Sequence, residues 1–376
     1  MHNPAALSQF RILSETVLAG REDRGAATPH SEASNQQSYR DLSSELFSCM
    51  KPENFQQLES LAAANHVVLR ALEPIAGTMI ALGNDRAAEQ ALAATVREKA
   101  RIDHALGFLE QICSSLQKAG YPVVVIKSLD HWPDLGSDLD LYSDADAAGV
   151  IAHLCARFKA RLMPRSWGDR LAHKWNCAIP GLPELVELHA GRLGQMGEQD
   201  SALRSLSLRS RNAQLGAHFF RVPAPEDRII LSTLQRMYRH FYIRLCDIVD
   251  IGQLLASAAV DFRHLRSISS DAGLWEGVAT YLRVIGEYIE SYDGNGVELP
   301  SFVFAAARFG VEQIRYAPAF LRVPIVPHSA GLYFSELKQL LQRGDLRNTF
   351  RLGLLPCLAT AALVEQKLTG SDKGVW

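Results

Sequence analysis

Apolar residues recur at helical spacing through the first third of the chain. Between 41 and 120 they return every three or four residues, which places them along one side of a helix. The preceding stretch, 21–39, is polar, contains Gly, Pro, Ser and Asn, and is typical of a linker, while 4–18 has the pattern of a short helix. We therefore predict a flexible N-terminal segment over 1–40 and a helical region over 41–120.

The pattern changes to short β-prone runs after Gly120. The predicted strands lie at 121–127, 137–142, 161–165, 173–179 and 184–189. A helix that ends near 158 follows the second strand, and Asp144 or Asp146 can cap its start. These elements predict an α/β core over 121–222.

Helical patterns return after 222. Pro223-Ala-Pro225-Glu226-Asp227 starts a helix, with Pro and acidic residues in its first turn. Helices are predicted over 226–238 and 244–256, and a helical C-terminal domain over 223–376. The predicted fold class is α+β: a small mixed β-sheet core flanked by N- and C-terminal helical regions.

Composition and net charge exclude several classes of binding partner and site. The chain has 376 residues and a net charge of −2, so no overall basic character argues for a long nucleic-acid partner. Its six cysteines are scattered without a C-x-x-C pair, which argues against a zinc ribbon or a disulfide framework and favours a reduced, cytoplasmic compartment. The apolar run 353–364 is too short to span a bilayer, so we expect a buried helix there and no membrane partner.

Two aspartates stand two residues apart in the second predicted strand. Asp138 and Asp140 therefore point to one face, while Leu139 and Leu141 point into a core. Parallel carboxylates repel each other unless a cation lies between them or one is protonated. A hard divalent metal ion, Mg²⁺ above all, is the first interpretation, and phosphate chemistry follows from it.

A third carboxylate is expected from the strand at 184–189. Glu184 shares its face with Val186 and Leu188, which are apolar, whereas Glu187 shares the other face with His189. We therefore choose Glu187; the structural alternative is a surface acid on an edge strand. His189 either contacts substrate, orients Glu187 or packs as a satisfied histidine.

Three segments resemble a known superfamily. They are Val125-Ile-Lys127-Ser128, Gly136-Ser-Asp138-Leu-Asp140-Leu and Val186-Glu187-Leu-His189. They resemble nucleotidyltransferases of the polymerase-β-like superfamily, in particular an uncharacterised bacterial branch with Lys-Gly, D-x-D and Asp-Leu-His motifs. The 223–227 helix start and Arg244-Leu-Cys-Asp247-Ile-Val-Asp250 also look like that branch, so the resemblance covers roughly 123–255.

The resemblance implies an enzyme that moves a nucleoside monophosphate from an NTP to a hydroxyl group and releases pyrophosphate. Asp138, Asp140 and Glu187 are then the catalytic residues and the ligands of a two-metal Mg²⁺ site. The predicted nucleotide-binding residues are Lys127, Ser128, Ser137, Lys174 and His189. Lys127 and Ser128 stand where the superfamily has a flexible Gly pair, and the alternative for Lys127 is an ion pair with Asp138 or Asp140.

The acceptor and two rival functions stay open. A small molecule or a peptide or protein side chain is favoured over nucleic acid, and a toxin-type enzyme that modifies protein or RNA belongs to the same chemistry. Loss of the Gly pair favours a nucleotide-binding scaffold with a decayed site. A structural Ca²⁺ site needs further oxygen ligands, for which Asp144 and Asp146 are candidates.

Polar residues outside these motifs receive simpler interpretations. Asp130 and Asp134 lie in the predicted loop, where solvated surface positions are expected. Asp247 and Asp250 share one side of a helix that supports the nucleotide site in the resembled superfamily. The aromatic and basic stretch 238–244 is expected to form a helix junction, with base stacking as the alternative.

Overall fold

The computed structural model describes residues 4–19, 47, 50–199, 206–257, 259–293, 296–317 and 319–357. The helices of the N-terminal half are α1 Pro4–Ala19, α3 Pro52–Ala64, α4 Val68–Ala81, α5 Asp85–Lys118, the 3₁₀ turn η2 Ser128–His131, α6 Ala147–Phe158 and α7 Trp167–Leu171. Those of the C-terminal half are α8 Leu206–Arg209, α9 Pro225–Thr233, the π-helical turn η3 Leu234–His240, α10 Leu245–Ala256, α11 Phe262–Ala272, α12 Trp275–Asp293, α13 Ser301–Ala306, η4 Val311–Gln313, η5 Ile325–Ser329, α14 Ala330–Gln342 and α15 Leu346–Gly353.

The strands form one mixed sheet and two small ribbons. They are β1 Val124–Val125, β2 Asp138–Ser143, β3 Arg161–Leu162, β4 Lys174–Ala178, β5 Leu185–Ala190, β6 Arg211–Leu215, β7 His218–Val222, β8 Tyr242–Ile243, β9 Arg315–Tyr316 and β10 Leu321–Arg322. The five-stranded sheet has the order β1-β2-β5-β4-β3, with β2 parallel to β5 and the other pairs antiparallel. The predicted α+β fold with a small mixed sheet is confirmed.

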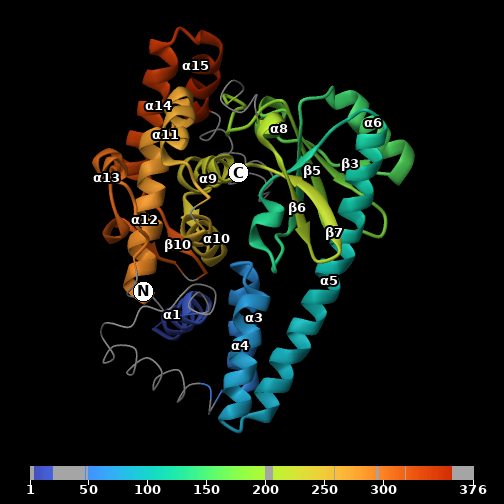
Figure 1. Ribbon diagram of the computed structural model, residues 1–376, viewed down its shortest axis with the longest axis vertical. Coiled ribbons are helices and arrows are strands. Elements are labelled where there is room, and N and C mark those ends of the chain that lie inside the picture. The colour runs from blue at the N-terminus through green and yellow to red at the C-terminus, as the bar shows by residue number, and fades with distance from the viewer. Residues whose placement is uncertain are drawn as a thin grey trace.

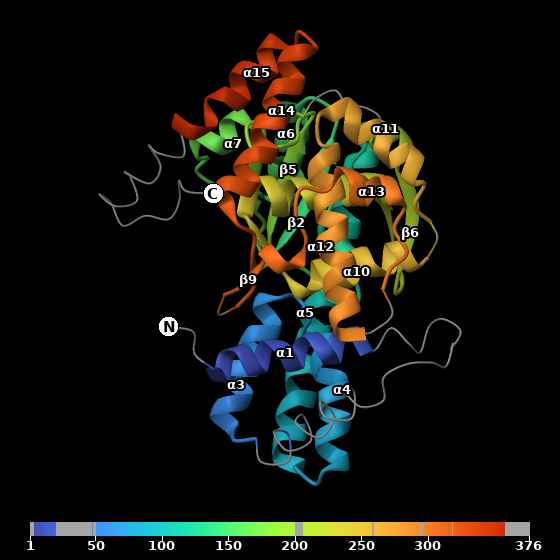
Figure 2. The same cartoon turned by 90° about the vertical axis from the view of Figure 1, so that its left-hand side faces the viewer.

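Helix α5 connects two hydrophobic cores. Its first half packs with α1, α3, α4 and the C-terminal helices in one core, to which it contributes alanines such as Ala91. Its second half, with Leu109 and Ile112, covers one face of the five-stranded sheet together with α6. Figure 1 shows α5 running from the N-terminal helices up to the sheet, and Figure 2 shows α1 lying across the N-terminal helices. The helical regions at the two ends of the chain therefore share one core.

The N-terminal helix differs from the expectation of a flexible segment over 1–40. Phe10 and Leu13 of α1 are buried, and α1 contacts both α4 and α12. These contacts are made with residues far away in the sequence, which is why a composition argument misses them. The predicted linker at 21–39 lies outside the described residues, as does the part of the apolar run 353–364 that follows 357.

The other elements follow the sequence closely, although β3 and β4 are shorter than the predicted strands. Asp146 caps α6 by accepting a hydrogen bond from Gly149 N, and the helix predicted over 226–238 continues from α9 into η3. The strand predicted over 121–127 is reduced to β1. Within the described residues, no helix has both the length and the apolar character needed to cross a membrane.

Candidate functional site

The site lies on the sheet face that α5 and α6 do not cover. Alternation along β2 places Asp138 and Asp140 on this face, while Leu139 and Leu141 are buried against α5 on the other. β5 runs parallel beside β2, with Asp140 directly opposite Glu187. The structure therefore brings together the carboxylates that strand alternation selects.

Cationic side chains surround these carboxylates. Lys127 Nζ lies 2.6 Å from Asp140 Oδ1 and 3.8 Å from Glu187 Oε1. Lys174 Nζ, from β4, lies 2.5 Å from Glu187 Oε2. His189 Nε2 lies 2.7 Å from Glu187 Oε1 and 3.2 Å from Asp140 Oδ1. Asp140 and Glu187 thus have counter-charges within the protein, and Lys127 adopts the ion pair that was the alternative to phosphate binding.

The segment that carries Lys127 is held tightly against β2. Lys127 has φ 60°, a left-handed conformation that side chains rarely adopt and that glycine adopts freely. Ser128 is buried; its Oγ accepts a hydrogen bond from Asp140 N at 2.7 Å and donates to Asp138 O at 3.0 Å. The Ser128 hydroxyl is therefore engaged with the backbone of β2, and a phosphate contact requires it to change partners.

Ser137 is the predicted nucleotide-binding residue that the structure does not bring to the carboxylates. It is exposed and lines a separate pocket with Arg101 and Glu184. It precedes Asp138 directly, so alternation along the chain turns its side chain away from the carboxylate face. Glu184, which strand alternation does not favour as the third carboxylate of the site, forms an ion pair in which its Oε1 lies 2.6 Å from Arg101 Nη1.

The three carboxylates differ in how well their charge is compensated. Burial, and then the nearby Glu187 and Asp140, raise the pKa of Asp138 to about 6. Burial alone acts to raise the pKa of Glu187, but the His189 hydrogen bond and the charges of Lys127 and Lys174 hold it well below its usual range. Asp138 makes no side-chain hydrogen bond or ion pair with any described residue, so it is the carboxylate that gains most from an added cation.

The raised pKa of Asp138 predicts a pH-dependent cost to stability in the metal-free protein. Because the folded-state pKa of about 6 exceeds the ordinary 3.8, stability falls as the pH rises through this window and the cost is complete above it. Asp138→Asn should therefore raise the free energy of unfolding by about 1 kcal/mol near pH 7.5, after discounting for solvent screening, and leave it unchanged near pH 4. Denaturant unfolding in EDTA measures both; an equal effect at both pH values contradicts the prediction.

The donor set fits a hard divalent cation. Ligand atoms of Asp140, Glu187 and His189 lie within 4.8 Å of one another, and Asp138 adds a further carboxylate on the same face. Carboxylate oxygens are the ligands that Mg²⁺ prefers. The competing groups are the two ammonium ions, Lys127 above all, because it lies between Asp140 and Glu187.

A buried ionic network supports the loop between Lys127 and β2. Asp250 of α10 pairs with Arg70 of α4 at 2.6 Å and with His131 of η2 at 2.5 Å. Arg70 also donates to Trp132 O at 2.6 Å. These ion pairs therefore join the loop that follows Lys127 to both helical regions, and no local sequence pattern singles out Arg70.

The expectation of solvated positions for the loop aspartates is wrong for Asp134. Its carboxylate is buried and accepts hydrogen bonds from Leu69 N at 2.7 Å and Arg70 N at 3.2 Å at the start of α4. Asp130 is half-buried and pairs with Arg228 at 2.6 Å. Asp134 therefore binds backbone N–H groups at the start of α4, which have no partner within the helix, and Asp130 binds a guanidinium group of α9. These protein groups take the place of the water that we expected around both side chains.

The stretch 238–244 forms a junction, as expected. Phe241, with φ 54°, ends η3 and redirects the chain into β8. Tyr242 packs on Phe320 and lies against the guanidinium groups of Arg236 and Arg244. The aromatic ring of Tyr242 is thus engaged within the protein rather than offered to a base.

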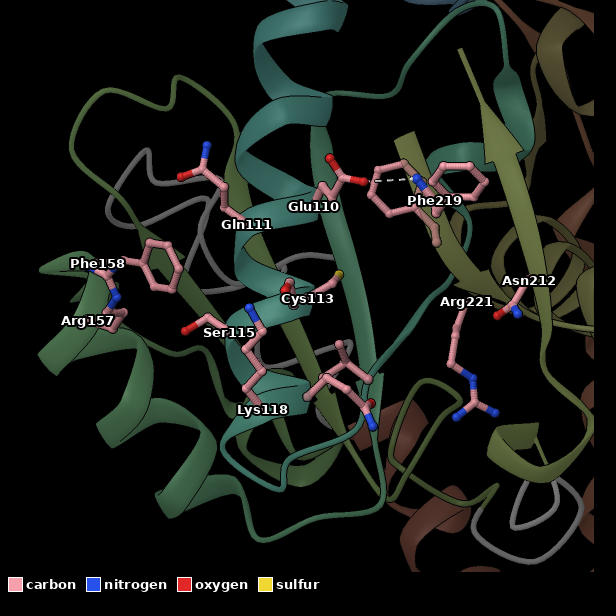
Figure 3. A pocket seen from close by; sticks show the side chains of 14 residues that line it. Glu110, Gln111, Cys113, Ser115, Lys118, Arg157, Phe158, Asn212, Phe219 and Arg221 are labelled. Carbon is pink, nitrogen blue, oxygen red and sulfur yellow. Dashed lines mark hydrogen bonds between the residues drawn. The ribbon is translucent and has the colours of Figure 1, made fainter. Parts of the chain in front are cut away.

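A broad groove lies away from the carboxylates. Its cavity volume is about 790 Å³, and it follows α5 between the end of α6 and the β6–β7 hairpin. Figure 3 shows Phe158 and Phe219 on its two sides, with Glu110 accepting a hydrogen bond from Phe219. It contains none of the predicted site residues.

Comparison with known proteins gives little similarity. No family model matches the sequence, and no curated protein matches it. A crystal structure of an antigenic nucleotidyltransferase-like protein from Paracoccidioides brasiliensis is similar with a TM-score of 0.32 and 15% identity, over 47% of this chain and 92% of that one.

Proposed function

We propose that the protein is a Mg²⁺-dependent nucleotidyltransferase that moves an NMP from an NTP to a hydroxyl group of a small molecule, peptide or protein. The main support for this proposal is that Asp138, Asp140 and Glu187 lie on one face of two neighbouring parallel strands. Carboxylates converge in this way where they hold cations for phosphoryl chemistry. The family motifs in the sequence support the same reading.

The side chains of the site have two roles: some bind the divalent cations, and others hold Glu187 in position. Asp138, Asp140 and Glu187 hold the divalent cations, which neutralise negative charge on the triphosphate when bound. Lys174 and His189 fix the Glu187 carboxylate through ion pairs and a hydrogen bond. Lys127 moves from Asp140 to the phosphates, exchanging one anionic partner for another.

The proposed transfer step is a nucleophilic displacement at the α-phosphorus of the NTP. The acceptor oxygen forms a bond to that phosphorus, the bond to the bridging oxygen breaks, and pyrophosphate leaves with the electron pair. The hydroxyl proton goes to a carboxylate. The candidate for this carboxylate is Glu187, which lies opposite Asp140 on β5.

The proposal is tested by titration and by label transfer. Isothermal titration with each NTP, in the presence and absence of Mg²⁺, measures whether nucleotide binding depends on the metal ion. Transfer of label from α-³²P-labelled NTPs to hydroxyl-bearing small molecules and peptides, with release of pyrophosphate, measures the reaction. If NTP binding does not depend on the metal ion and no pyrophosphate is released, the proposed nucleotidyltransferase activity is refuted.

The position of Lys127 favours one alternative, a nucleotide-binding scaffold with a decayed site. Its ammonium group already supplies a cation to Asp140 at 2.6 Å. In such a scaffold the internal ion pair is permanent and replaces the metal ion.

Lys127→Met separates the enzyme from the scaffold. In the enzyme, removal of the competing ammonium raises Mg²⁺ affinity without nucleotide by about tenfold, and NTP affinity falls because a phosphate partner is lost. Isothermal titration with MgCl₂ and with ATP measures both, and Lys118→Met, at an exposed lysine on α5, is the matched control. Unchanged Mg²⁺ affinity in Lys127→Met favours the scaffold.

A further inference from the structure

The two strands that carry the carboxylates lie between cations on either side. In the sheet order β1-β2-β5-β4, Lys127 follows β1 and Lys174 begins β4. Lys127 Nζ lies 2.6 Å from Asp140 Oδ1, and Lys174 Nζ lies 2.5 Å from Glu187 Oε2. The site therefore has a β1 side, which carries Lys127, and a β4 side, which carries Lys174.

Arg239 adds a second cation on the β4 side. It lies near the end of η3, where its carbonyl oxygen accepts a hydrogen bond at 3.4 Å from Gln195 Nε2, in the loop that follows β5. Burial, and after it the charge of Arg239, lower the pKa of Lys174, while Glu187 acts to raise it. The guanidinium group of Arg239 therefore lies near the ammonium group of Lys174.

This guanidinium group has no counter-ion among the described residues. Arg239 is half-buried, and its side chain makes no hydrogen bond or ion pair with any of them. The carboxylate of Glu198 is nearby, but it accepts hydrogen bonds from Gln195 N at 3.2 Å and Met196 N at 2.8 Å instead. A guanidinium group that lies near another cation and lacks an anion favours an anionic ligand.

Further arginines make the start of β4 positive. Burial lowers the pKa of His173, the residue before β4, and arginine charges from the loop after β5, the segment before α7 and helix α15 lower it further. These arginines are Arg192, Arg351, Arg165 and Arg347. Asp169 Oδ1, 3.9 Å from Lys174 Nζ, supplies negative charge on the same side, but the arginines exceed it. An anion that approaches from the β4 side therefore enters a region of positive charge.

An in-line displacement places the two substrates on opposite sides of the carboxylates. The attacking and leaving oxygens lie on opposite sides of the phosphorus atom. In the proposed reaction Lys127 binds the phosphates, so the leaving pyrophosphate lies on the β1 side and the acceptor lies on the β4 side. Glu187, the candidate for accepting the hydroxyl proton, lies on β5, which is the strand next to β4. Arg239 and Lys174 therefore face the acceptor rather than the leaving group.

We propose that Arg239 and Lys174 bind a carboxylate or phosphate group of the acceptor, so that the acceptor is a hydroxyl-bearing anion. Its hydroxyl oxygen forms the bond to the α-phosphorus, its proton passes to Glu187, and pyrophosphate leaves. Arg239 supplies a planar pair of N–H donors that matches the oxygens of either anionic group. The role of acceptor rests on the proposed nucleotidyl transfer, whereas the binding of an anion at Arg239 does not.

Isothermal titration of the full chain with glycerol 3-phosphate and with glycerate tests the anion site, and glycerol is the uncharged analogue. All titrations omit NTP and Mg²⁺. We expect saturable binding of at least one of the anions, about tenfold weaker binding of glycerol, and about tenfold weaker binding of the anion by Arg239→Gln. The anion that binds more tightly identifies the phosphate or the carboxylate as the recognised group. Arg263→Gln, at an exposed arginine of α11, is the matched control and should leave all affinities unchanged.

The affinity for Mg²⁺–ATP shows whether Arg239 contacts the acceptor or the triphosphate. Arg239→Gln should change this affinity by less than about twofold, because the phosphates lie on the β1 side. Arg239→Lys keeps the charge and should recover part of the lost anion affinity, which keeps the test decisive if Arg239→Gln disturbs the fold. A loss of Mg²⁺–ATP affinity with unchanged anion affinity assigns Arg239 to the triphosphate and overturns the proposal.

The anion site and the proposed function fail separately. The anion site is overturned if neither glycerol 3-phosphate nor glycerate binds saturably, or if Arg239→Gln leaves their binding unchanged. Label transfer from an NTP to an uncharged hydroxyl compound in that case leaves the nucleotidyltransferase intact. Normal anion binding without transfer from any NTP refutes the acceptor role and the proposed function but leaves the anion site.

Discussion

Asp140→Asn is expected to reduce nucleotidyl transfer by about 10³-fold, or ~4 kcal/mol of transition-state stabilisation. Asp140 contacts Lys127 and His189 and lies opposite Glu187, so it is the central carboxylate of the site. Asparagine keeps its size and its backbone hydrogen bond with Ser128 but removes the charge that holds a cation. Initial rates of label transfer from α-³²P-NTP measure the loss.

The control for this substitution is Asp103→Asn, at an exposed position on α5 outside the site. It removes one carboxylate charge from the protein and should leave the rate unchanged. The circular dichroism spectrum of Asp140→Asn should resemble that of the wild type because the amide fits the same space, and thermal unfolding measures how much stability is lost with the Lys127 ion pair. A variant that folds normally and transfers label at the wild-type rate refutes the assignment of these carboxylates.

The face of β2 and β5 that carries the carboxylates could be predicted because strand alternation is a local property. Asp138, Asp140, Glu187 and His189 follow from period-two spacing, and the parallel pairing of β2 with β5 then places Glu187 beside Asp140. The same rule turns Ser137 away from this face. Its proximity to Asp138 along the chain was a poor guide to its position in space.

The supports of the site could not be predicted because they join distant parts of the chain. Arg101 and Glu184 are 83 residues apart, and Arg70 and Asp250 are 180 residues apart. Each arginine lies on a helix whose apolar spacing predicts the helix but not the partner of a polar side chain. The positive φ of Lys127 depends on the same packing, since the surrounding structure must hold a conformation that a lysine disfavours.

Asp250→Asn is expected to lower the free energy of unfolding by about 3–5 kcal/mol. Burial alone acts to raise the pKa of Asp250, but Arg70 and His131 lower it below its ordinary value. A lowered folded-state pKa means that the carboxylate stabilises the protein above its unfolded-state pKa, near 4, and that this stability is lost as the pH falls through the folded-state value. Denaturant unfolding near pH 7 measures the loss, and Asp271→Asn, at an exposed aspartate of α11, should change it by less than about 0.5 kcal/mol.

The double variant Asp250→Asn with Arg70→Met shows where this stability comes from. Asp250→Asn alone leaves the Arg70 guanidinium buried without its anion, whereas the double variant removes both charges, so its loss should be smaller than the sum of the single losses. Arg70 also holds Trp132 O, and Asp250 holds His131, both in the loop that carries Lys127. We therefore expect Asp250→Asn to weaken NTP binding as well, through displacement of this loop. A loss below about 1 kcal/mol, or strictly additive losses, means that the network does not support the loop.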